Sequence, residues 1–491
     1  MAATQETTTL PGQGAQAFFA SMFASRTDAE LESIASTKRF FERYIGDVRF
    51  REALQAGESP QALCDARGLA VDAERLKPIW QNDLWQTIKD EGRQEEWSEA
   101  FLWARWVGQL LEHRDMLKEH AGHTDEGRFS AWRRRQMNRT DSELGPRNRS
   151  ITHPIVAYEL TKGCTVGCWF CGIAAEEYQG AFPYTPDNAA LWQGVLEVMH
   201  ARFGEASQTG FCYWATDPMD SPDYDRFITD HWNIVGWLPQ TTTAAPLKDE
   251  ALTRRVMALF DQALCVINRF SVISLRQLDT IHAAFTPREL LAVELVMQNK
   301  GALTHKAVAG RVRSRREQLQ ELGREASDGS QLDTGTIACV SGFLINMVER
   351  KVQLVSPCAA SGRWPLGYRI YDQGRFETPE DFADQIERMI DAHMPEGLQG
   401  EAVIRIRDDL QIGNVEDGAL HLGNDFVKHT VSGFPFIERL VNLIGKDGAT
   451  VRHVMERMSG EGEDVFAISA MIQELYDSGL VDWELARPRA A

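Results

Sequence analysis

Tyr158-Glu-Leu-Thr-Lys-Gly-Cys164-Thr-Val-Gly-Cys168-Trp-Phe-Cys171 holds three cysteines in one glycine-bearing loop, directly after an apolar run. Thiolates are soft ligands that select iron–sulfur clusters, zinc or Cu(I). A structural zinc site is closed by four ligands, and no fourth ligand is evident beside these three. A four-iron cluster bound by these cysteines alone would keep one iron free for a group other than protein. The alternatives are a zinc site completed by a remote ligand such as His153, or three packed thiols.

The composition is that of a globular protein with more than one domain. The chain has 491 residues, 43% of them hydrophobic and 25% charged, and a single core seldom reaches this size. A net charge of −19 argues against a nucleic-acid surface, which would be basic. No apolar run reaches the roughly 18 residues that span a bilayer, and the N-terminus lacks a signal pattern. Outside the triplet the cysteines are scattered, which fits a reducing cytosol. We therefore expect a cytoplasmic protein with no membrane or nucleic-acid partner.

Residues 1–149 are expected to form a helical N-terminal domain behind a loose polar tail. Apolar residues between Ala17 and His120 recur at spacings of three and four, as in Phe40, Phe41 and Tyr44. Such a stripe is most often core, although a domain of this kind could also hold a peptide. A basic connector follows up to Arg149, and we place the start of the next domain at residue 150.

Residues 150–395 alternate short apolar runs with helical periods, which predicts βα units around a parallel sheet. We expect a helix over Leu191–Phe203 and strands over Thr209–Trp214, Leu238–Thr243 and Leu264–Ser274. In parallel α/β barrels the carboxyl ends of the strands carry the chemistry. The residues that follow these strands are therefore candidates for a common site.

Two β-rich runs, Thr336–Met347 and Lys351–Val355, flank a short polar segment and predict a hairpin. The second run delivers Ser356-Pro357-Cys358 at its end. A thiol in this position could face the same mouth as the cysteine loop.

The cysteine loop resembles that of the radical S-adenosylmethionine (SAM) superfamily, whose C-x3-C-x-aromatic-C motif binds a [4Fe-4S] cluster. The aromatic residue of the motif is Phe170 here. The resemblance implies an α/β fold, a partial (β/α)6 barrel. It also implies that the open iron takes the amino and carboxylate groups of SAM. Ala215-Thr216-Asp217-Pro218 stands where the superfamily carries a Gly-Gly-Glu-Pro-like motif that binds the SAM ammonium group. Ala215 and Thr216 replace the glycines and Asp217 the glutamate, but carbonyls and a carboxylate still accept from an ammonium group.

Three further residues are implied SAM contacts. Thr243 ends the third expected strand, where its hydroxyl could reach the ribose. Arg269 on the fourth strand could pair with the SAM carboxylate, with Arg276 as a rival. Ser271, or alternatively Ser274, could also reach the ribose.

Within this superfamily, Ser-Pro-Cys358 and the following Trp364-Pro-Leu-Gly-Tyr368 resemble the radical SAM peptide epimerases that mature ribosomal peptides. That resemblance covers about Ile151 to Phe376. It implies that an adenosyl radical removes the α-hydrogen of an L-residue and that a thiol returns hydrogen from the opposite face. Cys358 is the candidate donor, because Cys212 and Cys339 lie inside apolar runs where cysteine is usually a small buried hydrophobe.

Other functions are favoured less by the cysteine count. Thioether-forming maturases usually carry auxiliary clusters, and the five cysteines outside the triplet include no C-x-x-C pair. Another radical SAM peptide modification stays open as an alternative. So does a non-catalytic iron–sulfur or peptide-binding protein.

Residues 396–491 are expected to form a separate α+β module. Strands are predicted over Ala402–Arg407, Ala419–Leu422 and Phe426–Val431, and helices over Ile437–Ile444, Val451–Met458 and Ile468–Tyr476. Three strands before three helices resemble the PqqD-like recognition element, a winged-helix module that binds leader peptides by strand addition. The implied partners are a precursor peptide, with its leader and core, and an electron donor such as flavodoxin or ferredoxin.

Overall fold

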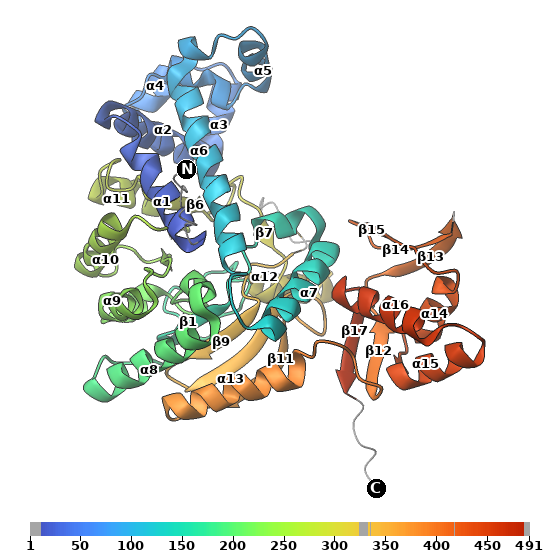
Figure 1. Ribbon diagram of the computed structural model, residues 1–491. Helices are drawn as coiled ribbons and strands as arrows, with labels where there is room; N and C mark the ends of the chain where they lie inside the picture. Colours follow the sequence, from blue (N-terminus) through green and yellow to red (C-terminus); the bar gives the residue numbers. More distant parts are fainter. Residues whose placement is uncertain (1–10, 324–331, 334, 417, 486–491) are drawn as a thin grey trace, which may run out of the picture.

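The structure, a computed structural model, describes residues 11–323, 332–333, 335–416 and 418–485 (Figure 1). It is a mixed α/β protein whose described sheets are not closed into a barrel. The α/β class expected from the sequence is therefore confirmed. Among the described helices, none combines the length and apolar character that a membrane span requires.

The N-terminal part of the chain is helical. Its elements are α1 (Pro11–Ala24), α2 (Asp28–Gly46), α3 (Val48–Gln55), α4 (Pro60–Asp65), η1 (Ala73–Ile79), α5 (Asn82–Asp90), η2 (Gln94–Trp97), α6 (Ser98–His120), α7 (Gly127–Leu144) and η3 (Gly145–Ser150). Helix α2 begins with a capping box between Thr27 and Glu30. The apolar faces of α1, α2 and α6 share one core that includes Phe19, Ile34 and Trp106. Helix α6 extends from this bundle down to the strands (Figure 1).

The central part alternates helices with short strands. Its first half comprises β1 (Val156–Glu159), β2 (Thr161–Lys162), β3 (Gly180–Ala181), α8 (Pro186–Phe203), η4 (Gly204–Thr209), η5 (Pro218–Asp220), α9 (Tyr224–Val235), β4 (Thr242–Thr243), α10 (Glu250–Ala263), β5 (Asn268–Val272), α11 (Leu275–Ala284) and β6 (Val293–Met297). Its second half comprises β7 (Lys306–Ala307), α12 (Gly310–Glu321), β8 (Leu332–Asp333), β9 (Gly342–Asn346), β10 (Lys351–Pro357), β11 (Tyr368–Arg375) and α13 (Pro379–His393).

Parallel pairings connect these strands in a defined order. Strands β4, β5 and β6 form one sheet, and β1 pairs with β9 in another that continues antiparallel into β10 and β11. Single parallel bridges link Ala157 to Phe211 and Phe211 to Gln240, which joins the two sheets. Because these pairings are parallel, the carboxyl ends of β1, β4, β5 and β9 share one edge. Helices α8, α9 and α13 cover the outer side, over a core that includes Trp192 and Phe227.

The expected elements of the central part are confirmed with corrected bounds. Helix α8 starts before Leu191 because Thr185 caps it and Pro186 occupies its first turn. The hairpin of β9 and β10 is present. The strand predicted over Thr209–Trp214 is wrong in extent: η4 continues to Thr209, and only the bridge at Phe211 remains.

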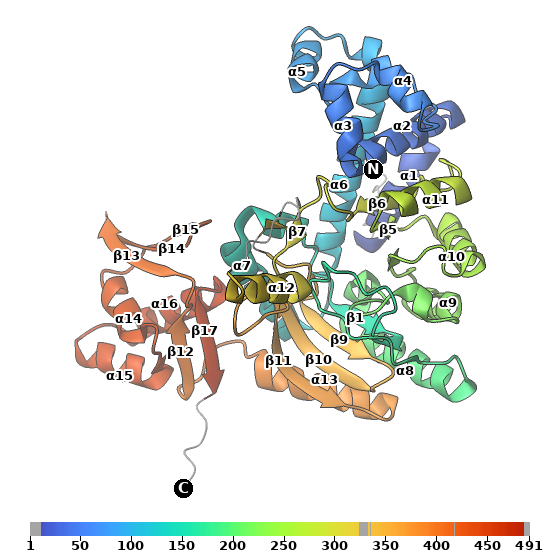
Figure 2. The same ribbon diagram turned by 180° about the vertical axis from the view of Figure 1, so that it is seen from behind.

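The C-terminal part has its own apolar core, which includes Ile404, Leu440 and Leu475. Its elements are β12 (Ala402–Ile406), β13 (Gln411–Glu416), β14 (Ala419–Gly423), β15 (Lys428–Val431), α14 (Ile437–Ile444), β16 (Ala449–Thr450), α15 (Val451–Gly460), α16 (Val465–Asp477) and β17 (Val481–Leu485). The three predicted helices are confirmed. The predicted strands do not share one sheet: β12 lies between β16 and β17, while β14 lies between β13 and β15. Figure 2 shows this part beside α7 and β11.

Candidate functional site

The cysteine loop begins directly beyond the carboxyl end of β1. All four residues of β1 are buried, as expected for a central parallel strand. Gly163 then turns the chain with φ +75°, and a Cβ there would collide with the carbonyl oxygen of Glu177. Only glycine adopts this conformation at low cost. The Cys164 N–H donates to the Glu176 carbonyl (3.0 Å), which fixes the start of the loop.

The three thiols of the loop are partly exposed and close enough to influence one another. Burial raises the pKa of Cys164 to about 11 and that of Cys168 to about 12, and the neighbouring Cys171 and Cys164 thiols contribute to the latter. The Cys171 Sγ accepts a hydrogen bond from the Ala175 N–H (3.3 Å). In the described residues, no three Cys, His, Asp or Glu side chains converge where a single metal ion could bind. A four-iron cluster does not require the three thiolates to meet at one metal ion, because each thiolate binds a different iron. The donor set therefore suits a cluster.

Helix α12 holds the loop from a distant part of the chain. The Arg311 N–H donates to the Cys171 carbonyl (3.0 Å), and its guanidinium donates to the Cys168 carbonyl (2.8 Å). Gly310 permits this close approach: a Cβ there would lie 2.5 Å from the Cys171 carbonyl oxygen, and its φ is +51°. A cation beside the loop would also favour a negatively charged cluster.

Phe170 packs edge-on against Trp169, with ring centroids 5.6 Å apart. Lys300 and Arg315 lie within about 6 Å of the Trp169 ring centroid. The edge-on contact between the two rings and the cations from neighbouring segments thus hold the aromatic pair on the loop.

Asp217 lies close to the loop, and its charge contributes to the raised pKa values of Cys164 and Cys168. Its carboxylate is 4% exposed and accepts from the Thr243 hydroxyl (2.7 Å) and the Ala244 N–H (2.7 Å). Burial raises the pKa of Asp217 although these hydrogen bonds oppose the shift. The structure therefore brings Asp217 and Thr243 together, with the carboxylate already engaged by the protein.

The remaining expected SAM contacts are placed as follows. Ala215 and Thr216 are partly exposed, with backbone groups that lead into Asp217. Arg269 stands level with Thr242 and pairs with Glu294 on β6 (2.9 Å). Ser271, two residues nearer the carboxyl end of β5, is partly exposed.

Glu159 is a site residue that the sequence analysis missed. It is the last residue of β1 and is 7% exposed. Its carboxylate accepts from the Ala215 N–H (2.8 Å) and from the Asn346 side-chain amide on β9 (2.9 Å). Burial raises its pKa to about 7, so it exchanges a proton near neutrality. The sequence signal that could have identified Glu159 is a charged residue inside an apolar run. By holding Ala215, Glu159 orients the segment that leads to Asp217.

Cys358 is 1% exposed at the end of β10. It lies at a junction with α7, where Arg139 donates to the Pro357 carbonyl (2.7 Å). Burial raises its pKa to about 12; the Glu143 carboxylate adds to this shift, and Arg139 and Arg369 oppose it. The accessible loop position expected from the sequence is wrong, because Cys358 is buried among charged groups. The mouth expected to be shared with the cysteine loop is wrong as well. Strand β10 runs antiparallel to β9, with Val355 opposite Gly342, so its end lies level with the start of β9 and β1, whereas the cysteine loop leaves the carboxyl end of β1.

A cavity of about 490 Å³ lies between helices α2 and α6 and the segments that precede β1, β5 and β9. From the central part it is lined by Phe211, Tyr213, Arg269 and Cys339, whereas Cys358 does not line it. Cys339 and Cys171 both pack against one small apolar cluster. A second thiol therefore lines an internal cavity.

Comparisons with known proteins give one close relative. The chain is 44% identical over 471 residues to the uncharacterized protein y4wI of Sinorhizobium fredii, which covers 95% of this chain and 91% of that protein. No protein-family model matches the chain. The crystal structure of BtrN in complex with AdoMet and 2-DOIA matches with a TM-score of 0.23 and 12% identity, over 29% of this chain and 56% of BtrN. A likeness at that level carries no argument about the present site.

Proposed function

The chain belongs to the family of the Sinorhizobium fredii protein y4wI, and we propose its function from the residues of the site. The proposed function is that of a radical SAM enzyme that converts L- to D-residues in a ribosomally made peptide. The observation that carries the proposal is the cysteine loop at the carboxyl end of β1. Its Cys164 and Cys171 thiols lie close enough to Cys168 to raise the pKa of that thiol, and Asp217 lies near Cys164 and Cys168.

The cysteine loop and the segment at Ala215 and Thr216 would hold different groups. Cys164, Cys168 and Cys171 would bind three irons of a [4Fe-4S] cluster. SAM would occupy the fourth iron, near the backbone of Ala215 and Thr216. When bound and reduced, such a cluster supplies the electron that cleaves SAM and releases a hydrogen-abstracting adenosyl radical. A partial (β/α)6 arrangement of the strands would place the peptide at the shared carboxyl edge.

A thiol would return hydrogen to the substrate radical from the opposite face. Cys358 is the donor implied by the resemblance to peptide epimerases, and its S–H bond is weaker than most C–H bonds. Burial keeps the Cys358 thiol protonated at neutral pH, because its pKa is about 12. The resulting sulfur radical would need one electron and one proton, which an external donor such as flavodoxin or ferredoxin and solvent would supply.

A second candidate function is another radical SAM modification of a peptide C–H bond. It is favoured by the position of Cys358, which is buried against α7 and does not line the internal cavity. In that case Cys358 would stabilise the junction and would not react.

We expect the anaerobic, reduced protein to form 5′-deoxyadenosine from SAM, and in D2O to place one deuterium at Cα of each inverted residue. The assay would supply, as substrate, a ribosomal precursor peptide whose gene neighbours that of this chain. Cys358→Ala should stop D-residue formation while leaving SAM cleavage intact, because only the hydrogen donor is lost. Mass spectrometry of the peptide measures both results.

Cys339→Ala is the matched control for this experiment. It removes a thiol that lines the cavity, and it should leave deuterium uptake unchanged. Unaltered uptake in Cys358→Ala, with uptake lost in Cys339→Ala, would transfer the donor role to Cys339. Unaltered uptake in both variants would exclude thiol return.

A further inference from the structure

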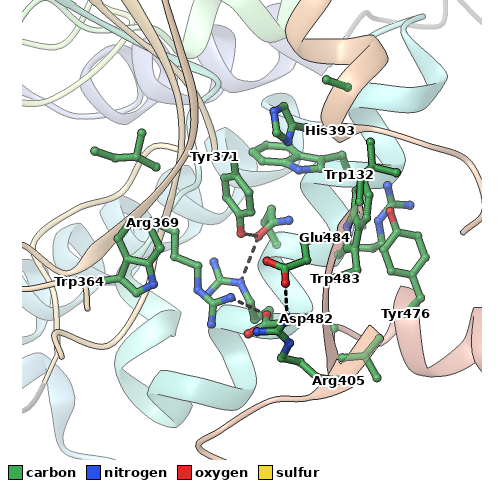
Figure 3. Close-up of a pocket in the computed structure, with 18 of the residues that line it drawn as sticks. Trp132, Trp364, Arg369, Tyr371, His393, Arg405, Tyr476, Asp482, Trp483 and Glu484 are labelled. Atoms are coloured by element: carbon green, nitrogen blue, oxygen red, sulfur yellow. Dashed lines mark hydrogen bonds and ion pairs between the residues drawn. The ribbon is translucent and has the colours of Figure 1, made fainter. Parts of the chain in front are cut away.

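A cleft outside the cysteine site lies where the central and C-terminal parts meet. It encloses about 320 Å³ and is lined by α7, β11, α16 and β17. We call it the edge cleft and define it by Arg363, Arg369, Tyr371, Arg405, Trp483 and Glu484. Figure 3 shows the last five of these residues.

Two open strand edges border the edge cleft. Strand β11 is the last strand of its sheet and pairs with β10, and β17 is the last of its sheet and pairs with β12. Both views show β17 between β12 and the central part, so its open edge faces the side of β11 (Figures 1 and 2). An open edge presents unpaired N–H and C=O groups that can accept another strand.

The residues that line the edge cleft show that the backbone edge of each strand borders it, and not only one face of the strand. Consecutive residues of β17, Val481 to Leu485, line it, as do Arg369, Ile370 and Tyr371 on β11. Because successive side chains of a strand point to opposite faces, one face would contribute alternate residues only. Across the cleft, a side-chain ion pair joins Arg369 to Asp482 (2.6 Å).

The charge of the edge cleft is opposite to that of the whole chain. Its lining contains five arginines and two carboxylates, whereas the chain carries a net charge of −19. Four of these arginines pair with carboxylates: Arg135, Arg139, Arg369 and Arg405. Arg363 forms no ion pair with any described residue, and it lies over the Trp364 ring at 5.3 Å. Within the described part of the chain, the buried Nε atoms of Arg369 and Arg405 have no hydrogen-bond partner. Cationic and aromatic groups along a strand edge suit an extended acidic chain.

We propose that the edge cleft binds an extended acidic peptide segment, which adds a strand to β11 or β17 and pairs its carboxylates with Arg363 and its neighbours. The site differs from the edge of β15, the last strand of the other C-terminal sheet. The proposal does not depend on SAM chemistry, since binding requires neither cluster nor SAM.

The test uses the full chain and a fluorescein-labelled ten-residue peptide of alternating valine and glutamate, followed by fluorescence anisotropy. Arg363→Glu should raise Kd at least about tenfold, because a repelling charge replaces an attracting one. Lys428→Glu makes the same charge change on β15 and should leave Kd unaltered. A peptide with N-methyl groups on alternate residues keeps its charges but loses strand pairing, and it should also bind at least about tenfold more weakly.

Either of two results would overturn the proposal. One is equal binding of the N-methylated and parent peptides, which would show attraction by charge alone. The other is weakened binding in Lys428→Glu with unchanged binding in Arg363→Glu, which would place the peptide on β15. Thermal unfolding of both variants at the wild-type temperature shows that each is folded; both side chains are exposed. SAM cleavage is measured separately, so failure of the proposed enzyme activity would leave this result intact.

Discussion

We expect Cys168→Ala to lower the iron content of the reconstituted protein from about four atoms per chain to less than one, and to reduce SAM cleavage by more than about 100-fold. Loss of residues that only support a metal ligand typically costs 10–100-fold, so loss of a ligand should cost more. The loop itself should persist, because Arg311 holds its backbone at the Cys168 and Cys171 carbonyls. Iron analysis and chromatography of 5′-deoxyadenosine measure the two effects.

Cys64→Ala is the matched control for this variant. Cys64 lies in α4 within the N-terminal helices and is 0% exposed. Its removal should leave iron content and SAM cleavage at the wild-type level. Full iron occupancy and turnover in Cys168→Ala would show that this thiol is not a ligand.

Glu143→Ala should destabilise the protein by about 3–5 kcal/mol, the cost of leaving the buried charge of Arg139 without its ion-pair partner. Glu143 is buried on α7 and pairs with Arg139 (2.9 Å), with Arg369 and with Arg407 (3.9 Å). These arginines connect α7 to β11 and to the C-terminal part. Without the carboxylate, the buried Arg139 loses its ion pair, whereas Arg369 and Arg407 keep Asp482 and Asp409. Urea unfolding followed by tryptophan fluorescence measures the loss.

The effect of Glu143 should depend on pH in a defined direction. Burial opposes its ionisation, but the three arginines outweigh burial and lower its pKa to about 2. A lowered pKa gives stability that is present above the ordinary carboxyl value of about 4.5 and is lost as the pH falls toward 2. The stability difference between wild type and Glu143→Ala should therefore shrink by more than half between pH 6 and pH 3.

Glu401→Ala serves as the control, since Glu401 forms an exposed pair with Arg452 and should cost little at either pH. A difference for Glu143→Ala that is independent of pH would show that the arginines do not control this carboxyl group.

The local part of the site could be predicted from the sequence, because its signal is local. All of its signals lie within a few residues: the cysteine spacing, Gly163 and the apolar run before them. The loop begins where the apolar pattern predicts that β1 ends. Glu159 has its partner Asn346 187 residues away, and Arg311 reaches the loop across 143 residues. Contacts of this kind arise from the packing of strands and helices and leave no local pattern.

Strand pairing shows the same difference between local contacts, which could be predicted, and distant contacts, which could not. The hairpin of β9 and β10 is adjacent in sequence and was predicted. Strand β12 pairs instead with β17 at the end of the C-terminal part, which no periodicity near Ala402 indicates. The buried position of Cys358 likewise depends on α7, more than 200 residues earlier.

Electron paramagnetic resonance of the anaerobically reconstituted, reduced protein, recorded with and without SAM, tests the open iron most directly. We predict the signal of a reduced [4Fe-4S] cluster whose spectrum changes when SAM is added, because SAM would bind the iron that no side chain occupies. A protein that carries zinc, or a cluster whose spectrum is the same with and without SAM, would contradict the account.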